Sequence, residues 1–156
     1  MNRRHGYLLV LGTARDPVGM DRYHNQLPPI YAEHKGYRLV VGSPGDGATF
    51  LDGGLDNLSM MLARFPSPEC ISDFWWSDEY RKAYIHRKDA GRFSAVGLPG
   101  LDQEPDPMPG RRGFLVAMAT PASPGGWRRF ADPFITGISG HGGTVLADAG
   151  PEAIER

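Results

Sequence analysis

Short apolar runs alternate with a helical stripe at the start of the chain. Residues 7–11 and 37–41 are apolar runs that predict strands, because each is too short for a buried helix. Between them, over residues 18–35, apolar side chains recur at helical spacing and predict a helix. Pro28 and Pro29 fall inside this stripe and are expected to kink it. The chain is therefore predicted to begin with strand, helix and strand.

The following residues repeat this order. A Gly-rich loop over 42–54 leads to a predicted third strand at 57–65, and a capping Ser followed by Pro predicts a helix over 67–76. A further helix at 77–88 and a fourth strand at 92–98 complete the region. The order βαββαβ predicts an α+β, ferredoxin-like unit with a four-stranded antiparallel sheet and its helices on one face.

The last third of the chain repeats the first third. Residues 6–14 return as residues 113–121, an offset of 107 positions, with matching Gly, Pro, Arg and His positions further along. A fixed offset of this kind indicates one structural unit used twice. We therefore predict a complete unit over 1–98, a Pro-rich linker over 99–112 and a C-terminal βαβ half repeat over 113–156.

The first two strands are apolar without alternation, at Leu8–Leu11 and Leu39–Val41. Such runs are typical of strands that are buried on both faces. One face meets the helices, and we expect the other to pack against a second sheet, as in a dimeric α/β-barrel. The half repeat, from residue 113 to 156, is below the size at which cores usually sustain themselves. It is expected to dock on the first unit or to be exchanged with a partner chain.

Composition excludes several classes of partner and location. The net charge is -1, so neither nucleic acid nor an anionic membrane is an expected partner. No run approaches the ~20 apolar residues of a membrane span, and the apolar run at the N-terminus recurs inside the chain, where no signal peptide can operate. A single cysteine, Cys70, allows no intrachain disulfide and is expected to be a packed thiol. We expect a cytoplasmic protein.

Several motifs resemble those of a known family. They are residues 34–40 (HKGYRLV), the Phe-Pro-Ser at 65–67, residues 74–80 (FWWSDEY) and Arg87. Over about residues 6–98 the chain resembles the DUF1330 family of the dimeric α/β-barrel superfamily, although its Gly-rich loop and half repeat depart from the family's pattern. The resemblance implies a ferredoxin-like fold and a homodimer. The superfamily includes cofactor-free monooxygenases, cyclases, isomerases and haem proteins, so it leaves the activity open.

Two groups of polar residues are candidates for catalysis. Asp21 and His24 lie three positions apart on one helix face, where the acid could orient the imidazole as a general base. His86 and Arg87 end a basic helix and could hold a carboxylate or enolate oxygen. The alternatives are a solvated helix face for the first pair and charge matching at a helix end for the second. His34 precedes a Gly and is expected to serve the helix end.

An aromatic cluster is the candidate pocket wall. Its predicted members are Tyr23, Tyr31, Trp75, Trp76 and Tyr80. Consecutive aromatic residues cannot all face one core, so at least one Trp is expected to be partly exposed, at a pocket or at a subunit interface.

Two functions follow from these candidates. The first is an enzyme that uses metal-free acid/base chemistry, such as cyclisation, isomerisation or cofactor-free oxygenation, on a small aromatic or enolisable substrate. The second is a non-catalytic ligand-binding or interaction module in which the duplication serves oligomerisation. We expect no metal and no cofactor, because no cluster of His and acidic residues marks a metal site and the loop at 42–47 lacks the Lys of a phosphate loop.

Overall fold

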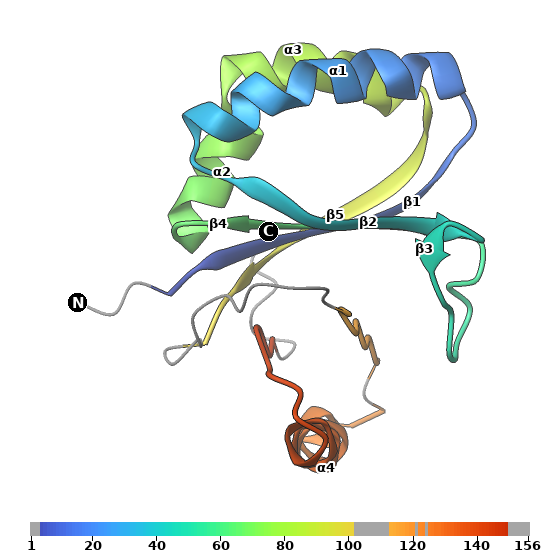
Figure 1. Ribbon diagram of the computed structural model, residues 1–156, viewed down its shortest axis with the longest axis vertical. Helices are drawn as coiled ribbons and strands as arrows, with labels where there is room; N and C mark the ends of the chain where they lie inside the picture. Colours follow the sequence, from blue (N-terminus) through green and yellow to red (C-terminus); the bar gives the residue numbers. More distant parts are fainter. Residues whose placement is uncertain (1–3, 102–112, 121, 124, 150–156) are drawn as a thin grey trace.

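A five-stranded sheet carries three helices on one face (Figure 1). The computed structural model describes residues 4–101, 113–120, 122–123 and 125–149. The strands are β1 (Gly6–Ala14), β2 (Tyr37–Pro44), β3 (Gly47–Ala48), β4 (Ser59–Phe65) and β5 (Gly91–Pro99). The helices are α1 (Pro17–Glu33), α2 (Pro68–Trp76), α3 (Asp78–Lys88) and α4 (Gly126–Gly140). The sheet order is β3-β2-β4-β1-β5.

The sheet differs from the predicted four-stranded antiparallel sheet at one edge. The pairs β2–β4, β4–β1 and β1–β5 are antiparallel, but β3 adds a two-residue strand parallel to β2. Instead of giving way to a loop at residue 42, β2 continues to Pro44, and Gly45 and Gly47 then adopt positive φ values of 78° and 79°. Because glycine tolerates this left-handed backbone, the chain reverses there and returns to the edge of β2. The sheet is therefore mixed.

Helix α1 follows directly from a capping motif. The Asp16 carboxylate accepts a hydrogen bond from the Val18 backbone N–H at 3.0 Å, and Pro17 occupies the first turn, where its missing N–H costs nothing. The helix continues through Pro28 and Pro29, both of which lie on its exposed side. The predicted kink at these prolines stays a prediction.

Helices α2 and α3 are separated by one residue, Ser77. Its hydroxyl accepts a hydrogen bond from the Tyr80 backbone N–H at 3.2 Å and donates to the Phe74 carbonyl at 2.8 Å, which ends α2 and begins α3. Phe74 and Tyr80 are completely buried, with ring centroids 4.6 Å apart, and Tyr31 of α1 stacks on Phe74 at 4.8 Å. The layer between helices and sheet is therefore filled with aromatic side chains.

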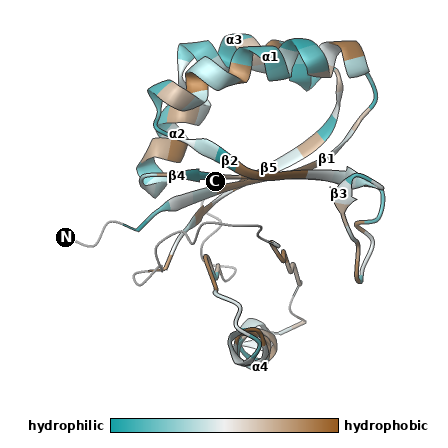
Figure 2. Ribbon diagram, in the orientation of Figure 1, coloured by the Kyte–Doolittle hydropathy of each residue, from teal (hydrophilic) through white to brown (hydrophobic). Residues whose placement is uncertain are grey.

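The opposite face of the sheet is also apolar and covered. Tyr7, Leu9, Leu11 and Leu62 form a second buried cluster, which we call the outer-face cluster. Phe114, Val116, Leu146 and Ala147 of the C-terminal part pack against it. Figure 2 shows the middle strands as the most hydrophobic part of the ribbon, and Figure 1 places the C-terminal part opposite α1–α3. β1 is thus buried on both faces, as its apolar run predicts.

The C-terminal part contains the predicted helix, and its described residues form no second sheet. α4 spans Gly126–Gly140, whereas the described residues 113–120 and 143–149 form no strands, and residues 150–156 lie outside the described part. The reason lies in the topology of the first unit, in which β1 and β2 are not neighbours because β4 lies between them. A strand–helix–strand half contains no counterpart of β4, and neither of its described outer segments pairs as a strand with another described residue. The division into two domains, and any exchange between chains, stay predictions.

Candidate functional site

A buried cation is the most unusual chemical feature of the molecule. Arg87 lies in the last turn of α3 and is only 3% exposed. Its Nη1 donates a hydrogen bond to the Tyr80 hydroxyl at 2.8 Å, and the Tyr80 and Tyr23 hydroxyl oxygens are 3.1 Å apart. A chain of hydrogen bonds thus links Arg87 of α3 to Tyr23 of α1 inside the protein.

Four aromatic rings surround the Arg87 guanidinium. Its central carbon lies 4.9 Å from the ring centroid of Phe93, 5.4 Å from Trp75, 5.7 Å from Tyr84 and 5.8 Å from Tyr23. The described residues include no carboxylate within ion-pair distance of Arg87. Cation–π contacts stabilise a buried guanidinium by about 0.5–2 kcal/mol each. They supply no opposite charge, so within the described part of the chain no carboxylate offsets the positive charge of Arg87.

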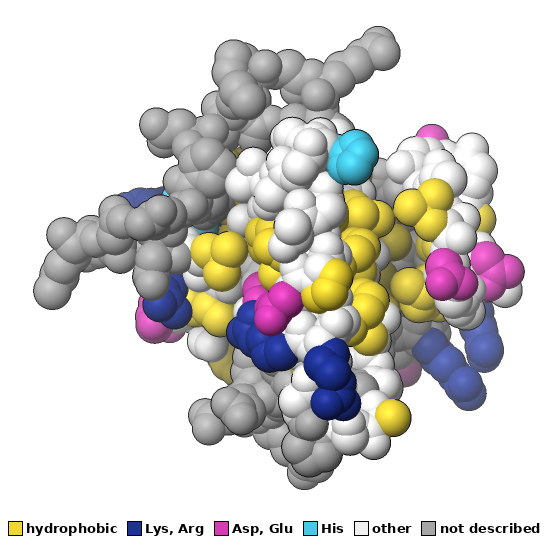
Figure 3. Space-filling view, turned by 90° about the horizontal axis from the view of Figure 1, so that it is seen from below, with side chains coloured by type: hydrophobic (Ala, Val, Ile, Leu, Met, Phe, Trp, Pro, Cys, Tyr) yellow, Lys and Arg dark blue, Asp and Glu magenta, His cyan; other side chains and the backbone are white. Residues whose placement is uncertain are grey.

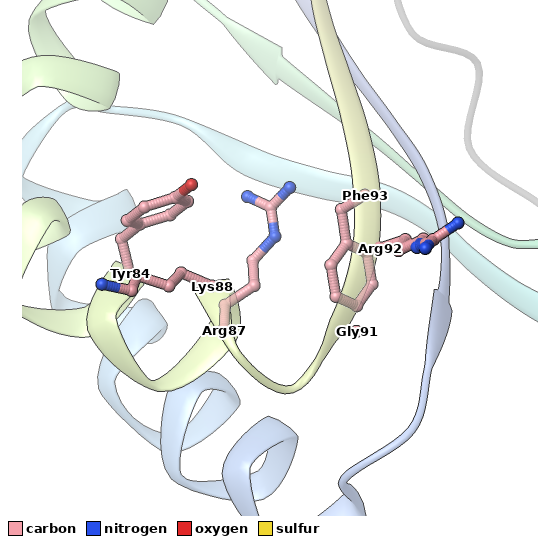
Figure 4. A pocket seen from close by; sticks show the side chains of 6 residues that line it. All are labelled: Tyr84, Arg87, Lys88, Gly91, Arg92 and Phe93. Carbon is pink, nitrogen blue, oxygen red and sulfur yellow. The ribbon is translucent and has the colours of Figure 1, made fainter.

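A hollow of about 270 Å³ opens beside Arg87. It is lined by Tyr84, Arg87, Lys88, Gly91, Arg92 and Phe93 (Figure 4). In this view the guanidinium lies between the rings of Tyr84 and Phe93, while the Arg92 side chain points away. The hollow is polar and positively charged, and it lies where the turn after α3 enters β5.

The turn that forms one side of the hollow is held by close backbone contacts. The Ala90 carbonyl accepts hydrogen bonds from the backbone N–H groups of Arg15 and Asp16, at 2.7 and 3.0 Å. At Gly91 the backbone approaches β1 so closely that a Cβ atom would overlap the Thr13 carbonyl oxygen. A glycine here brings the end of α3 and the start of β5 together, and with them Arg87 and Phe93.

Tyr80 and Tyr31 remain protonated. Burial is the largest cause that raises the pKa of Tyr80 far above its usual range, followed by the neighbouring Tyr23, and the Arg87 charge only partly opposes this. Burial likewise raises the pKa of Tyr31, which lies in the aromatic layer with its hydroxyl donating to the Met61 sulfur at 3.8 Å. Tyr80 therefore serves Arg87 as a neutral acceptor and keeps its own proton for the hydrogen bond network.

His24, the predicted general base, lies on α1 and outside the hollow. His24 and Asp21 are both exposed, and neither lines the hollow. Partial burial is the first cause that lowers the pKa of His24, the positive charge of Arg38 adds to it, and Asp21 acts in the opposite direction. The imidazole is therefore neutral near pH 7, which is the state a general base needs. The Tyr23 and His24 ring centroids are 5.6 Å apart, so the imidazole adjoins the hydrogen-bonded chain from outside.

The predicted site residues fall into two groups. The structure brings Arg87, Tyr80, Tyr23 and Trp75 together. Trp76 is 69% exposed, with the Arg81 guanidinium 5.4 Å from its ring, and His86 does not line the hollow. Asp21, His24 and Tyr31 are placed as described above.

The other residues of the hollow were not among the predicted site residues. Tyr84 lies four residues after Tyr80 and three before Arg87, so helical spacing alone could have placed it on the same face. Phe93 and Gly91 reach Arg87 through the pairing of β5 with β1, a contact that local spacing does not reveal.

Two further features are absent from the described ranges. No group of three or more His, Cys, Asp or Glu side chains there is arranged to hold a metal ion. Nor does this part of the chain contain a helix with the length and hydropathy needed to cross a membrane.

Several solved structures are similar to part of this chain. A protein of unknown function from Rhodopseudomonas palustris matches with a TM-score of 0.50 and 20% identity, covering 64% of this chain and 84% of that one. A dimeric protein of unknown function and ferredoxin-like fold from Bacteroides fragilis matches with a TM-score of 0.42 and 13% identity, covering 61% and 95%. A candidate antibiotic biosynthesis monooxygenase from Caulobacter crescentus matches with a TM-score of 0.40 and 10% identity, covering 64% and 92%.

These structural matches leave the activity open. At 20% identity the Rhodopseudomonas palustris match shows a shared fold alone. No protein of curated function matches the sequence. The family model described as "Domain of unknown function (DUF1330)" matches residues 5–101, which include the whole sheet, α1–α3 and the hollow beside Arg87. The chain therefore belongs to the DUF1330 family.

Proposed function

We propose that this chain is an enzyme that acts on a small aromatic or enolisable anion by acid/base chemistry of its own side chains. In this proposal Arg87 holds a carboxylate or enolate oxygen of the substrate. The observation that supports it most directly is the burial of the Arg87 guanidinium beside an open hollow without a carboxylate partner among the described residues.

An anionic ligand would supply the negative charge that Arg87 lacks among the described residues. Removing a charge from water costs several kcal/mol, and proteins usually offset that cost with an opposite charge. A guanidinium binds a carboxylate through charge-assisted hydrogen bonds, and it can stabilise negative charge that develops on an enolate oxygen. The flanking rings of Tyr84 and Phe93 favour a ligand with an apolar or aromatic part. The proposed substrate is therefore a small carboxylate or enol with an apolar body.

His24 is the proposed proton acceptor, with Asp21 orienting it. Its pKa is lowered, so the imidazole is free to accept a proton near pH 7. It reaches the Arg87 cluster only through Tyr23, whose hydroxyl belongs to the hydrogen-bonded chain. Cyclisation, isomerisation and cofactor-free oxygenation all begin with such a proton transfer, so the proposal names this step and leaves its outcome among those three.

A second candidate function is a binding module without catalysis. Two observations favour it: the helix–sheet layer is filled by aromatic side chains, and Asp21 and His24 do not line the hollow. In that case Arg87 would hold an anionic ligand, and the C-terminal repeat would serve oligomerisation.

Proton exchange separates the two candidates. Phenylpyruvate is both aromatic and enolisable, and in D₂O the protein should accelerate deuterium uptake at its benzylic carbon, as followed by ¹H NMR. Benzoate and salicylate test binding alone by thermal shift. Arg87→Met should abolish both effects, while Lys82→Met, a control at an exposed position of the same helix, should retain them. Binding without exchange favours the module, and binding that is unchanged in Arg87→Met contradicts both candidates.

A further inference from the structure

The charged residues that line the hollow are all hydrogen-bond donors. They are Arg87, Lys88 and Arg92, whose side chains carry donors and no acceptor, and no acidic residue lines the hollow with them. The surface on the α4 side differs, because Figure 3 shows positive and negative side chains together on it. The hollow therefore fits a ligand that presents several acceptor oxygens better than one that has hydrogen bonds to donate.

Tyr84 brings a hydroxyl to the same hollow. It lies three residues before Arg87 on α3, so the two side chains leave the same face of the helix. In Figure 4 the Tyr84 hydroxyl and the Arg87 guanidinium end on the same side of the hollow. The hydroxyls of Tyr80 and Tyr23 are engaged in the hydrogen-bonded chain, whereas that of Tyr84 makes no hydrogen bond to a described residue. The Tyr84 hydroxyl can therefore donate to a ligand.

Contacts within the helices hold the Tyr84 ring in place. The Arg81 guanidinium carbon lies 4.4 Å from the ring centroid, and that of Arg87 lies 5.7 Å from it. One cation precedes Tyr84 by three residues and the other follows it by three, so both cation–π contacts form along one side of α3 without a ligand. A donor that is already positioned loses little freedom on binding, and it can therefore discriminate between ligands.

We propose that the hollow binds 2-oxo acids and that Tyr84 recognises the oxo group. This inference rests on the proposed function, because Arg87 holds the carboxylate in both. A 2-oxo acid carries its carboxylate and its oxo oxygen on adjacent carbons, which matches a guanidinium and a hydroxyl that end side by side. The oxo oxygen is an acceptor only, and the Tyr84 hydroxyl donates to it. Tyr84 is then a specificity-determining residue, because a simple carboxylate offers its hydroxyl no second oxygen.

Two ligands that differ only in the oxo group test this proposal. Phenylpyruvate and 3-phenylpropionate share the carboxylate, the chain length and the ring. In isothermal titration, the wild type should bind phenylpyruvate about 10-fold more tightly, as one added hydrogen bond allows. Tyr84→Phe keeps the ring and removes only the hydroxyl, so it should abolish this preference and leave the affinity for 3-phenylpropionate unchanged. Tyr37→Phe, which removes the hydroxyl of a β2 tyrosine outside the hollow, is the matched control and should retain the preference.

The outcomes separate this inference from the proposed function. If neither ligand binds the wild type, the proposed function fails and the inference fails with it. If both ligands bind the wild type equally, the carboxylate site stands and the inference alone is wrong. A preference that persists in Tyr84→Phe also contradicts the inference, because another residue then recognises the oxo group. Equal weakening of both ligands in Tyr84→Phe contradicts it as well, because the hydroxyl would then shape the hollow rather than distinguish the ligands.

Discussion

Replacing Arg87 with methionine distinguishes a guanidinium that binds a ligand from one that holds the fold together. Methionine has a similar length and no charge, and its sulfur makes favourable contacts with the same aromatic rings, worth about 0.3–1.5 kcal/mol each. If the guanidinium stabilises the fold, Arg87→Met should lower the free energy of unfolding substantially. If the guanidinium binds a ligand, Arg87→Met should change the free energy of unfolding little and abolish ligand binding.

The expected change in the free energy of unfolding is small because large contributions oppose each other. The variant loses the hydrogen bond from Arg87 to Tyr80, about 1.5–3 kcal/mol for a charged donor. It also loses the contacts with four aromatic rings, about 0.5–2 kcal/mol each and not additive. In return, it removes the penalty of several kcal/mol for burying an unpaired charge. We expect these to cancel to within about 2 kcal/mol.

Urea unfolding followed by circular dichroism measures this change without relying on Trp75, which contacts the substituted side chain. Ligand binding is measured on the same samples, since an anion at 100 times its Kd should stabilise the wild type by about 2.7 kcal/mol. Arg87→Met should show no such stabilisation. A loss of more than about 4 kcal/mol in the ligand-free variant, with no anion stabilising the wild type, would refute the reasoning and make Arg87 a structural residue.

Three further predictions concern the hollow and its surroundings. Gly91→Ala should destabilise the protein by about 1–3 kcal/mol, because the added Cβ would meet the backbone of β1. Gly97→Ala is the control, since the nearest atoms to its added Cβ lie at 3.6 and 3.7 Å. Equal urea midpoints for the two variants would contradict the prediction. Tyr80→Phe should leave the circular dichroism spectrum unchanged but weaken benzoate binding, because Arg87 loses its only hydrogen-bond acceptor among the described residues. A titration that gives an unchanged affinity for benzoate would count against this role of Tyr80. His24→Gln should lower the rate of proton exchange by about 10²–10⁴ with little change in stability. Because the pKa of His24 lies below its usual 6.5, the exchange rate should rise with pH with its midpoint below that value, and a rising limb centred above pH 7 would rule out His24 as the base.

Much of the first unit could be predicted from local sequence. The caps at Ser67 and Ser77 mark helix starts that the structure retains, because each serine side chain accepts a backbone hydrogen bond at the first turn. The continuous apolar run of β1 indicated burial on both faces, and both faces are covered. β3 was missed because it depends on a two-residue contact across a turn, which has no periodic signal of its own.

The candidate site was harder to predict, because a site depends on contacts between elements. Arg87, Tyr80 and Tyr23 were named from their chemistry, but the sequence offered no means of telling that the cation is buried while His24 and Asp21 are exposed. Trp75 and Trp76 are neighbours with nearly the same local signal. Only the packing of α2 against α3 turns Trp75 toward Arg87 and leaves Trp76 at the surface.

The interleaved order of the sheet has a consequence for hydrogen exchange. β1 is hydrogen-bonded along both edges, so its amides can exchange only when the sheet opens as a unit, at a free energy near that of global unfolding. β5 lies at the edge of the sheet and pairs with β1 alone among the described strands, so the amides on its other edge should exchange through local opening at a lower free energy. Two neighbouring strands of one sheet would then differ in protection, with β1 the more strongly protected.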